Sequence, residues 1–263
     1  PSPKGEMPLQ DWIVPVHYSR SDLRFTALAP TPGAGAVQPS LDEALAELRG
    51  EDGATPEAPH MAPDELAAAE ARFVGRGSEF YPLEVATKAH PDILLQAPGG
   101  TGKTELAKGF ARWWRDTGGV EQPGFVFFHS FEPGGASFGL DGVLLEIGNR
   151  FFDTDLLSRT TPAERKALLL KVLRENAMLL IWDNFESVHS MVDADGATPL
   201  TDAAREEIKA FLDALSAPGG KTRVLITSRT AEDWLGPLRR IELGNLPPQD
   251  AAEYAGEILS GYA

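Results

Sequence analysis

The chain has 263 residues, enough for one large domain or for a medium domain with appendages. Its 42% hydrophobic and 24% charged residues are typical of a globular protein and exclude wholesale disorder. A net charge of −15 argues against a general nucleic-acid-binding surface, and the absence of cysteine excludes disulfides, zinc–thiolate sites and thiol nucleophiles.

The N-terminal residues 1–5 lack an apolar signal core, and no run of about 18 apolar residues is long enough to span a membrane. We therefore expect a cytoplasmic protein without a membrane partner. The sequence has no initiator methionine and stops at Ala263 shortly after a helical pattern. We expect it to be a piece of a longer polypeptide.

Residues 1–62 are predicted to form an extended arm and a linker. The stretches 29–40 and 50–63 are rich in Pro, Gly and Ala and contain few bulky side chains that could pack a core. Residues 12–18 are apolar and β-prone, but an internal proline restricts them to an edge strand or an extended tail. The compact domain is expected to begin near residue 63.

Beyond residue 63, strand and helix patterns alternate. The predicted strands are short and almost continuously apolar: residues 93–96, 125–129, 178–182, 223–227 and 240–243. The predicted helices are residues 63–72, 78–89, 102–115, 161–176 and a segment around 208–215 that ends before Pro218. Such alternation is typical of a parallel sheet with helices on both faces. It predicts an α/β three-layer sandwich with a mainly parallel five-stranded sheet.

Residues 97–104 match the phosphate-loop pattern G-x-x-x-x-G-K-[ST], except that Ala97 replaces the first glycine. Glycines let successive backbone N–H groups turn toward a phosphate, and the N-terminus of the next helix adds partial positive charge. Lys103 is expected to reach the β- and γ-phosphates, and the Thr104 hydroxyl to ligate Mg²⁺. The alternative is a plain Gly-rich turn. The candidate ATP- or ADP-binding residues here are Pro98, Gly99, Gly100, Thr101, Gly102, Lys103, Thr104 and Glu105.

Asp183 follows four apolar residues of the third predicted strand. At the end of a strand neighbouring the phosphate-loop strand, it would hold Mg²⁺ through water, so that Thr104 and Asp183 are the predicted metal residues. The alternative is a solvated strand-end carboxylate. Hydrolysis needs a group that deprotonates or orients water. Glu186 is the better base and Asn184 could only orient the water, unless either side chain caps the next helix.

Arg229 follows the fourth predicted strand. A cation at the tip of a strand beside the phosphate-loop strand is well placed to contact a γ-phosphate and to distinguish ATP from ADP. The alternative is an ordinary surface charge. The candidate catalytic residues are therefore Lys103, Asp183, Asn184, Glu186 and Arg229.

Taken in order, Phe73-Val74-Gly75-Arg76-x-x-Glu79, the phosphate loop, residues 179–186 and residues 224–229 resemble the STAND class of signalling ATPases. Within that class they are most similar to bacterial NB-ARC-type domains over residues 65–260. The resemblance implies a P-loop NTPase fold in which Val74 and Arg76 line the adenine and ribose end of the pocket. It also implies that Arg229 is the sensor arginine. The expected domains are the arm at 1–62, the nucleotide-binding domain at 63–244 and the start of a helical subdomain at 245–263.

Residues 12–18 also resemble the closing strand of CHAT domains, peptidase-like modules often fused ahead of such ATPases, although no Cys/His dyad is present. The resemblances imply an ATP/ADP signalling switch with slow Mg²⁺-dependent hydrolysis, an upstream effector, a downstream sensor and a homo-oligomer in the ATP state. One alternative is an ADP-locked interaction module without turnover. Another is a small-molecule phosphotransferase, which the absence of an Arg-rich lid disfavours.

Overall fold

The computed structural model describes residues 75–131, 139–152, 157, 160–189 and 200–260. The predicted arm and linker, the predicted helix at 63–72 and Val74 lie outside the described residues.

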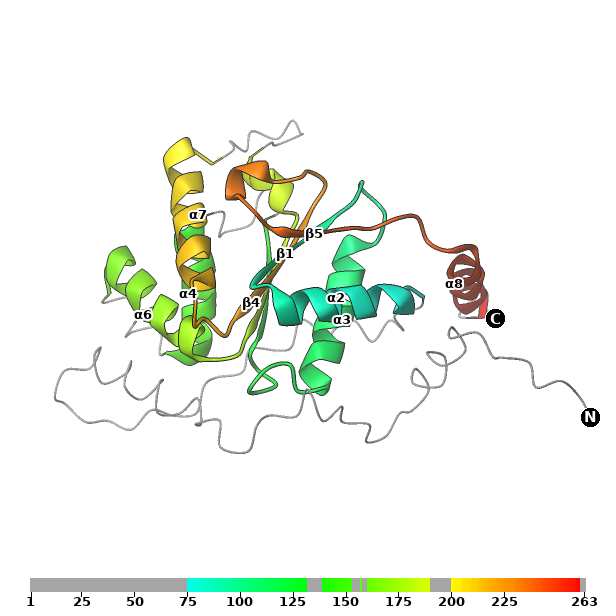
Figure 1. Ribbon diagram of the computed structural model, residues 1–263, viewed down its shortest axis with the longest axis horizontal. Helices are drawn as coiled ribbons and strands as arrows, with labels where there is room; N and C mark the ends of the chain where they lie inside the picture. The colour runs from blue at the N-terminus through cyan, green and yellow to red at the C-terminus, as the bar shows by residue number, and fades with distance from the viewer. Residues whose placement is uncertain (1–74, 132–138, 153–156, 158–159, 190–199, 261–263) are drawn as a thin grey trace, which may run out of the picture.

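The centre of the molecule is a five-stranded sheet in which every pair of neighbouring strands is parallel (Figure 1). Its strands are β1 (Asp92–Gln96), β2 (Val126–Ser130), β3 (Leu179–Asp183), β4 (Arg223–Ser228) and β5 (Arg239–Glu242). The predicted α/β architecture is thus confirmed, and all five strand predictions agree with the observed bounds to within one residue at each end.

The strand order is β2-β3-β4-β1-β5. The expectation that the strand carrying Asp183 neighbours the phosphate-loop strand is therefore wrong, because β4 pairs with both β1 and β3 and separates them. Apolar patterns identify strands but do not determine their order. As a result, the last residues of β4 lie between the loop that follows β1 and the acid that ends β3.

Helices cover both faces of the sheet, as the predicted three-layer sandwich requires (Figure 1). On one face lie α2 (Gly77–Ala89) and α3 (Lys103–Asp116), and on the other lie α4 (Leu140–Phe151), α6 (Pro162–Glu175) and α7 (Asp202–Ser216). The short 3₁₀ helices η3 (Phe185–Val188) and η4 (Asp233–Leu235) follow β3 and β4. Helix α8 (Pro248–Ser260) follows β5 and stands apart from these layers. None of the described helices is both long and apolar enough to cross a membrane.

Helix α4 is not among the predicted helices. Gly142 and Gly148 lower its intrinsic helix propensity, although its buried residues recur at helical spacing: Leu140, Val143, Leu144, Ile147 and Phe151. A Cβ on Gly148 would lie 3.0 Å from a methyl carbon of Leu157. Glycine here allows close packing, which the local pattern does not reveal.

Two predicted start and stop signals are confirmed. The Thr161 side chain and Glu164 form the capping box that opens α6, with Pro162 at the first helical position. Helix α7 ends at Ser216, just before Pro218. These local signals position the helices, while the buried side chains of the strands hold the sheet between them.

Candidate functional site

The loop between β1 and α3 begins at the carboxyl end of β1. The Ala97 N–H donates to the Ser228 carbonyl of β4 at 3.1 Å, which anchors the start of the loop to the neighbouring strand. Gly100 and Gly102 have φ values of 76° and 85°. This left-handed region favours glycine, and it lets the loop curl before α3 begins.

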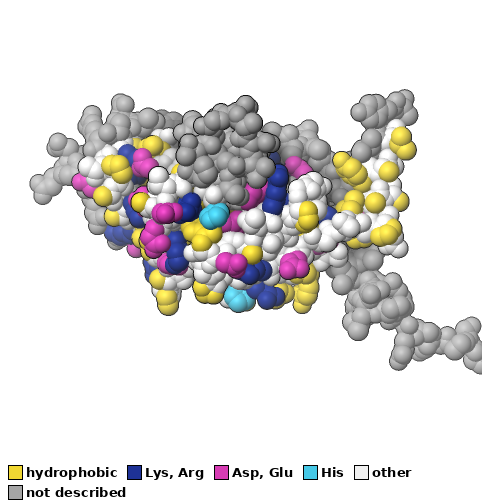
Figure 2. All heavy atoms as spheres, turned by 90° about the horizontal axis from the view of Figure 1, so that it is seen from above, with side chains coloured by type: hydrophobic (Ala, Val, Ile, Leu, Met, Phe, Trp, Pro, Cys, Tyr) yellow, Lys and Arg dark blue, Asp and Glu magenta, His cyan; other side chains and the backbone are white. Residues whose placement is uncertain are grey.

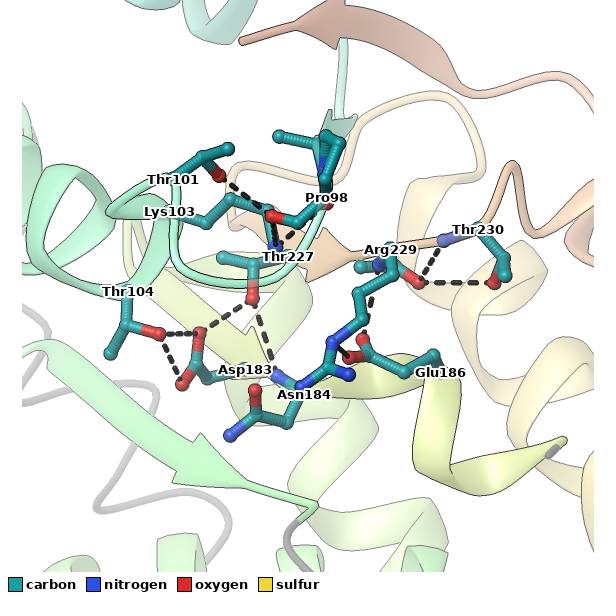
Figure 3. Close-up of polar contacts among 12 residues, drawn as sticks. Pro98, Thr101, Lys103, Thr104, Asp183, Asn184, Glu186, Thr227, Arg229 and Thr230 are labelled. Atoms are coloured by element: carbon teal, nitrogen blue, oxygen red, sulfur yellow. Dashed lines mark hydrogen bonds and ion pairs between the residues drawn. The ribbon is translucent and has the colours of Figure 1, made fainter. Parts of the chain in front are cut away.

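Lys103 is the first residue of α3, and its side chain is buried within the loop. Its Nζ donates to the carbonyl oxygens of Ala97 at 2.8 Å and Pro98 at 3.0 Å (Figure 3). Burial lowers the pKa of Lys103, and the nearby carboxylate of Glu186 partly opposes that effect. The ammonium group therefore lies under the loop with partners that a phosphate oxygen could replace.

Asp183, at the end of β3, is only 2% exposed and accepts hydrogen bonds from two threonines. The Thr104 hydroxyl lies 3.0 and 2.9 Å from its two carboxylate oxygens, and the Thr227 hydroxyl lies 2.5 Å from Oδ1 (Figure 3). Burial raises the pKa of Asp183, while the hydrogen bonds from Thr227 and Thr104 act in the opposite direction.

A hydroxyl beside a carboxylate fits Mg²⁺, which prefers oxygen ligands and usually retains several waters. The described residues contain no group of three or more His, Cys, Asp or Glu side chains that could hold a metal on their own. At this position Thr104 and Asp183 would supply the protein ligands of Mg²⁺, and phosphate oxygens of the nucleotide and water would supply the others.

Thr227 was not among the candidate site residues. Besides donating to Asp183, its hydroxyl accepts a hydrogen bond from the Asn184 N–H at 3.2 Å. The sequence signal is a hydroxyl residue that directly follows the apolar run of β4. Asp183 follows the apolar run of β3 in the same way. Because Trp182 lies opposite Ile226, these two strand ends are neighbours.

Asn184 adopts the left-handed region with φ of 54° and precedes η3, but its side chain makes no capping hydrogen bond there. Asn184 thus occupies the N-cap position of η3, but its side chain does not cap that helix. Its Nδ2 instead donates to the Ser130 hydroxyl of β2 at 3.3 Å. This contact orients the Asn184 amide toward the end of β2.

Glu186 and Arg229 form an ion pair at the same edge of the sheet. The Arg229 Nε lies 2.8 Å from Glu186 Oε1, and the Arg229 backbone N–H donates to Oε2 at 3.2 Å (Figure 3). A Cβ on Gly99 would lie 3.3 Å from the Arg229 Cζ, so the guanidinium packs against the phosphate loop. Three separate segments of the chain, at 103–104, 183–186 and 229, thus bring together Lys103, Thr104, Asp183, Glu186 and Arg229.

Arg76 is buried and contacts the phosphate loop. Its Nη2 donates to the carbonyl oxygens of Thr101 at 2.7 Å and Gly244 at 3.1 Å. Its backbone N–H donates to the Asp250 carboxylate of α8 at 2.6 Å. Arg76 therefore joins the phosphate loop to the segment after β5 and to α8. Glu105 is exposed in the first turn of α3.

These features define an α/β domain with the P-loop NTPase fold. No family model matches the sequence, and no curated protein matches it. Some solved structures are similar to it at low sequence identity. A DNA replication initiation factor is 15% identical with a TM-score of 0.44, covering 73% of this chain and 54% of that chain.

Two further structures are similar at the same level. A STAND protein with a tetratricopeptide repeat sensor from Pyrococcus horikoshii is 17% identical with a TM-score of 0.47, covering 70% of this chain and 25% of that chain. A chain of the HORMA:CdnC:Trip13 complex of E. coli MS115-1 is 13% identical with a TM-score of 0.45, covering 76% and 73%. The present chain thus spans about half of the replication factor and a quarter of the STAND protein.

Proposed function

We propose that the chain is a STAND-type, NB-ARC-like switch domain that binds ATP or ADP with Mg²⁺ and hydrolyses ATP slowly. The observation that carries this proposal is the position of Arg229, which packs against Gly99 of the phosphate loop and is paired with Glu186. A cation at this position contacts a nucleotide that has a γ-phosphate more closely than one that lacks it.

Nucleotide binding is supported by the residues around the loop. The backbone N–H groups near Gly100 and Gly102 and the N-terminus of α3 suit an anion. Lys103 would exchange its two carbonyl partners for phosphate oxygens. When bound between Thr104 and Asp183, Mg²⁺ would neutralise phosphate charge and polarise the γ-phosphate.

Switching is supported by the contacts of Arg76. A nucleotide that reshapes the loop near Thr101 would strain or release the hydrogen bonds of Arg76 to Thr101 and Gly244, and with them the connection to α8. Loop geometry and the position of α8 would then change together, as a two-state switch requires. ADP would favour the closed arrangement and ATP an open one.

A second candidate function, the ADP-locked module without turnover, is favoured by one observation. Arg229 already contacts both carboxylate oxygens of Glu186, through an ion pair to Oε1 and a backbone hydrogen bond to Oε2, which leaves this candidate base occupied. In the first proposal the γ-phosphate attracts the Arg229 guanidinium and releases Oε1 of Glu186. In the second, Glu186 stays paired and no water is activated.

The proposal extends to the parent protein. Helix α8 carries exposed hydrophobic side chains, including Tyr254 and Leu259. Figure 2 shows hydrophobic side chains in yellow at the end of the molecule where α8 lies. Exposed apolar side chains gathered on one helix support contact with another protein surface. We propose an upstream CHAT-like effector, a downstream sensor and homo-oligomer formation in the ATP state.

Single-turnover hydrolysis tests the proposal. With excess chain over labelled Mg·ATP, the unmodified chain should release phosphate, and Lys103→Ala and Asp183→Ala should each slow release by at least about 100-fold. Lys166→Ala is a matched control, because Lys166 pairs with Glu207 on the exposed surface of α6 and α7. Unchanged release in both site variants would refute the proposal, whereas binding without any release would favour the ADP-locked module.

A further inference from the structure

The turn that follows β4 is built around a buried carboxylate. Glu232 is 4% exposed, and three side chains donate hydrogen bonds to it. The donors are the Ser228 hydroxyl at 2.5 Å, the Thr230 hydroxyl at 2.5 Å and the Trp234 Nε1 at 2.7 Å. A buried carboxylate is stable only when it is hydrogen-bonded in this way, and its removal would leave the three donors without their acceptor.

Arg229 lies between two of these donors in the sequence. Because Glu232 binds the hydroxyls of Ser228 and Thr230, it fixes the backbone on both sides of Arg229. The Thr230 N–H also donates to the Ser228 hydroxyl at 3.1 Å, which closes the turn. The direction in which the Arg229 side chain leaves the backbone is therefore set by the contacts of Glu232.

Glu232 itself has φ of 48°, in the left-handed region. This conformation costs a residue with a Cβ about 1 kcal/mol. Three hydrogen bonds to one carboxyl group are enough to hold it. The hydrogen bonds of Glu232 thus hold its backbone in a conformation that a residue with a Cβ disfavours. A solvated surface turn has no need of such bonds.

The same carboxylate is linked to the segment that carries Glu186. Trp234 stacks on Phe185 with ring centroids 5.8 Å apart and an interplanar angle of 8°. Phe185 stacks in turn on Trp182 of β3, at 5.7 Å and 12°. Glu232 therefore connects the turn that bears Arg229 with the 3₁₀ helix that bears Glu186, and both partners of that ion pair depend on its contacts.

We infer that Glu232 is a positioning residue that holds the Arg229 guanidinium against the phosphate loop and thereby sets the preference of the site for ATP over ADP. This inference rests on the proposed function, in which Arg229 contacts the γ-phosphate. Glu232 acts through the turn, and its own carboxylate is enclosed by Ser228, Thr230 and Trp234.

The test compares nucleotide affinities of the full 263-residue chain after removal of bound nucleotide. Calorimetric titrations use ADP and the non-hydrolysable analogue adenylyl imidodiphosphate, each with Mg²⁺. In Glu232→Gln the ratio of the two dissociation constants should move by about 10-fold against the triphosphate, while the ADP affinity changes by less than about 2-fold. If Glu232 had a purely structural role, its substitution would weaken the binding of both nucleotides by the same factor.

Two further variants keep the test decisive. Trp234→Phe retains the stacking on Phe185 but removes one donor to Glu232, so it should produce a smaller shift of the same sign even if Glu232→Gln does not fold. Asp233→Asn is the matched control, because Asp233 is the exposed neighbouring acid and pairs with Arg240. It should leave the ratio unchanged.

A double variant identifies the route of the effect. In an Arg229→Ala background, Glu232→Gln should cause no additional change in the ratio. An additional change, or a normal ratio in Glu232→Gln when Arg229→Ala alone alters it, overturns the inference and leaves the proposed function intact. Absence of binding by the unmodified chain, or an unchanged ratio in Arg229→Ala, overturns the proposed sensing role itself.

Discussion

Glu186 holds Arg229 at two points, through the Nε of its guanidinium and through its backbone N–H. The Glu186 side chain is 12% exposed, whereas that of Arg229 is 61% exposed. An ion pair with one partner this exposed contributes less than about 1 kcal/mol. A γ-phosphate, which carries more charge and accepts several hydrogen bonds, would compete successfully for the guanidinium. In the proposed switch, the arrival of ATP therefore frees Oε1 of the candidate base, while Oε2 keeps the Arg229 N–H.

Replacing Glu186 by Gln tests this exchange. The variant should bind adenylyl imidodiphosphate about 2- to 5-fold more tightly, because Arg229 loses a competing anion, and it should hydrolyse ATP at least about 100-fold more slowly. Calorimetry and single-turnover assays measure the two effects. Glu207→Gln, on the exposed surface beside Lys166, is the control. Normal hydrolysis in Glu186→Gln would exclude Glu186 as the base.

Asp183→Asn should separate metal binding from stability. Asn Oδ1 can still accept from both Thr104 and Thr227, which share one oxygen of Asp183. Because burial raises the pKa of Asp183, its charge costs stability at neutral pH, so the nucleotide-free variant should be at least as stable as the unmodified chain in urea. Magnesium should no longer strengthen its binding of ATP. A variant that retains the full effect of Mg²⁺ contradicts the assignment of Asp183.

Local patterns predicted most of the fold. Apolar runs identified the five strands, and the box formed by Thr161 and Glu164 identified the start of α6. The order of the strands and the helix α4 were not predicted, because both depend on packing between segments distant in sequence. The insertion of β4 between β1 and β3 is what brings Thr227 into contact with Asp183.

For the same reason, the sequence predicted only some residues of the candidate site. A phosphate-loop motif is contiguous, so Lys103 and Thr104 could be identified from the sequence alone. Glu232 was not, because a glutamate in a polar turn is usually solvated, and its burial arises only from Ser228, Thr230 and Trp234 folding around it. The contact of Arg76 with α8 likewise depends on tertiary structure.

Gly75→Ala should loosen α8. Gly75 has φ of 81°, and a Cβ there would lie 2.8 Å from the Cβ of Asp250, so the substitution must displace Asp250 from the Arg76 N–H. Hydrogen exchange over 248–260 should become about 10-fold faster. Gly256→Ala is the control. Among the described residues, a Cβ on Gly256 meets no atom outside the backbone of its own helix within 4 Å, so this substitution should slow exchange in α8. Equal exchange in Gly75→Ala and the unmodified chain would contradict the proposed coupling.

Asp92 lies at the start of β1, at the end of the sheet away from the candidate site. Replacing it by Asn should stabilise the folded chain to an extent that depends on pH. Burial raises the pKa of Asp92 from 3.8 to about 6, and the hydrogen bond from Ser216 opposes this only in part. Because the folded chain holds this proton more tightly than the unfolded chain, its stabilising effect is full below about pH 4 and is lost as the pH rises through about 6.

At pH 8 the charged Asp92 therefore costs stability, and Asp92→Asn should raise the free energy of unfolding by about 1–3 kcal/mol. Near pH 4 the two chains should be equally stable. Urea unfolding at both pH values measures the difference, with exposed Asp116→Asn as the control. A loss of stability in Asp92→Asn at both pH values would show that its hydrogen bonding outweighs the cost of its charge.

The most direct test of the account is calorimetric titration of the folded, nucleotide-stripped chain with ADP and with Mg·adenylyl imidodiphosphate. We expect saturable binding at one site for both nucleotides, weakened about 100-fold in Lys103→Ala and unchanged in Lys166→Ala. If the folded, unmodified chain gives no binding signal with either nucleotide, the loop between β1 and α3 is not a phosphate site and the proposed switch is wrong.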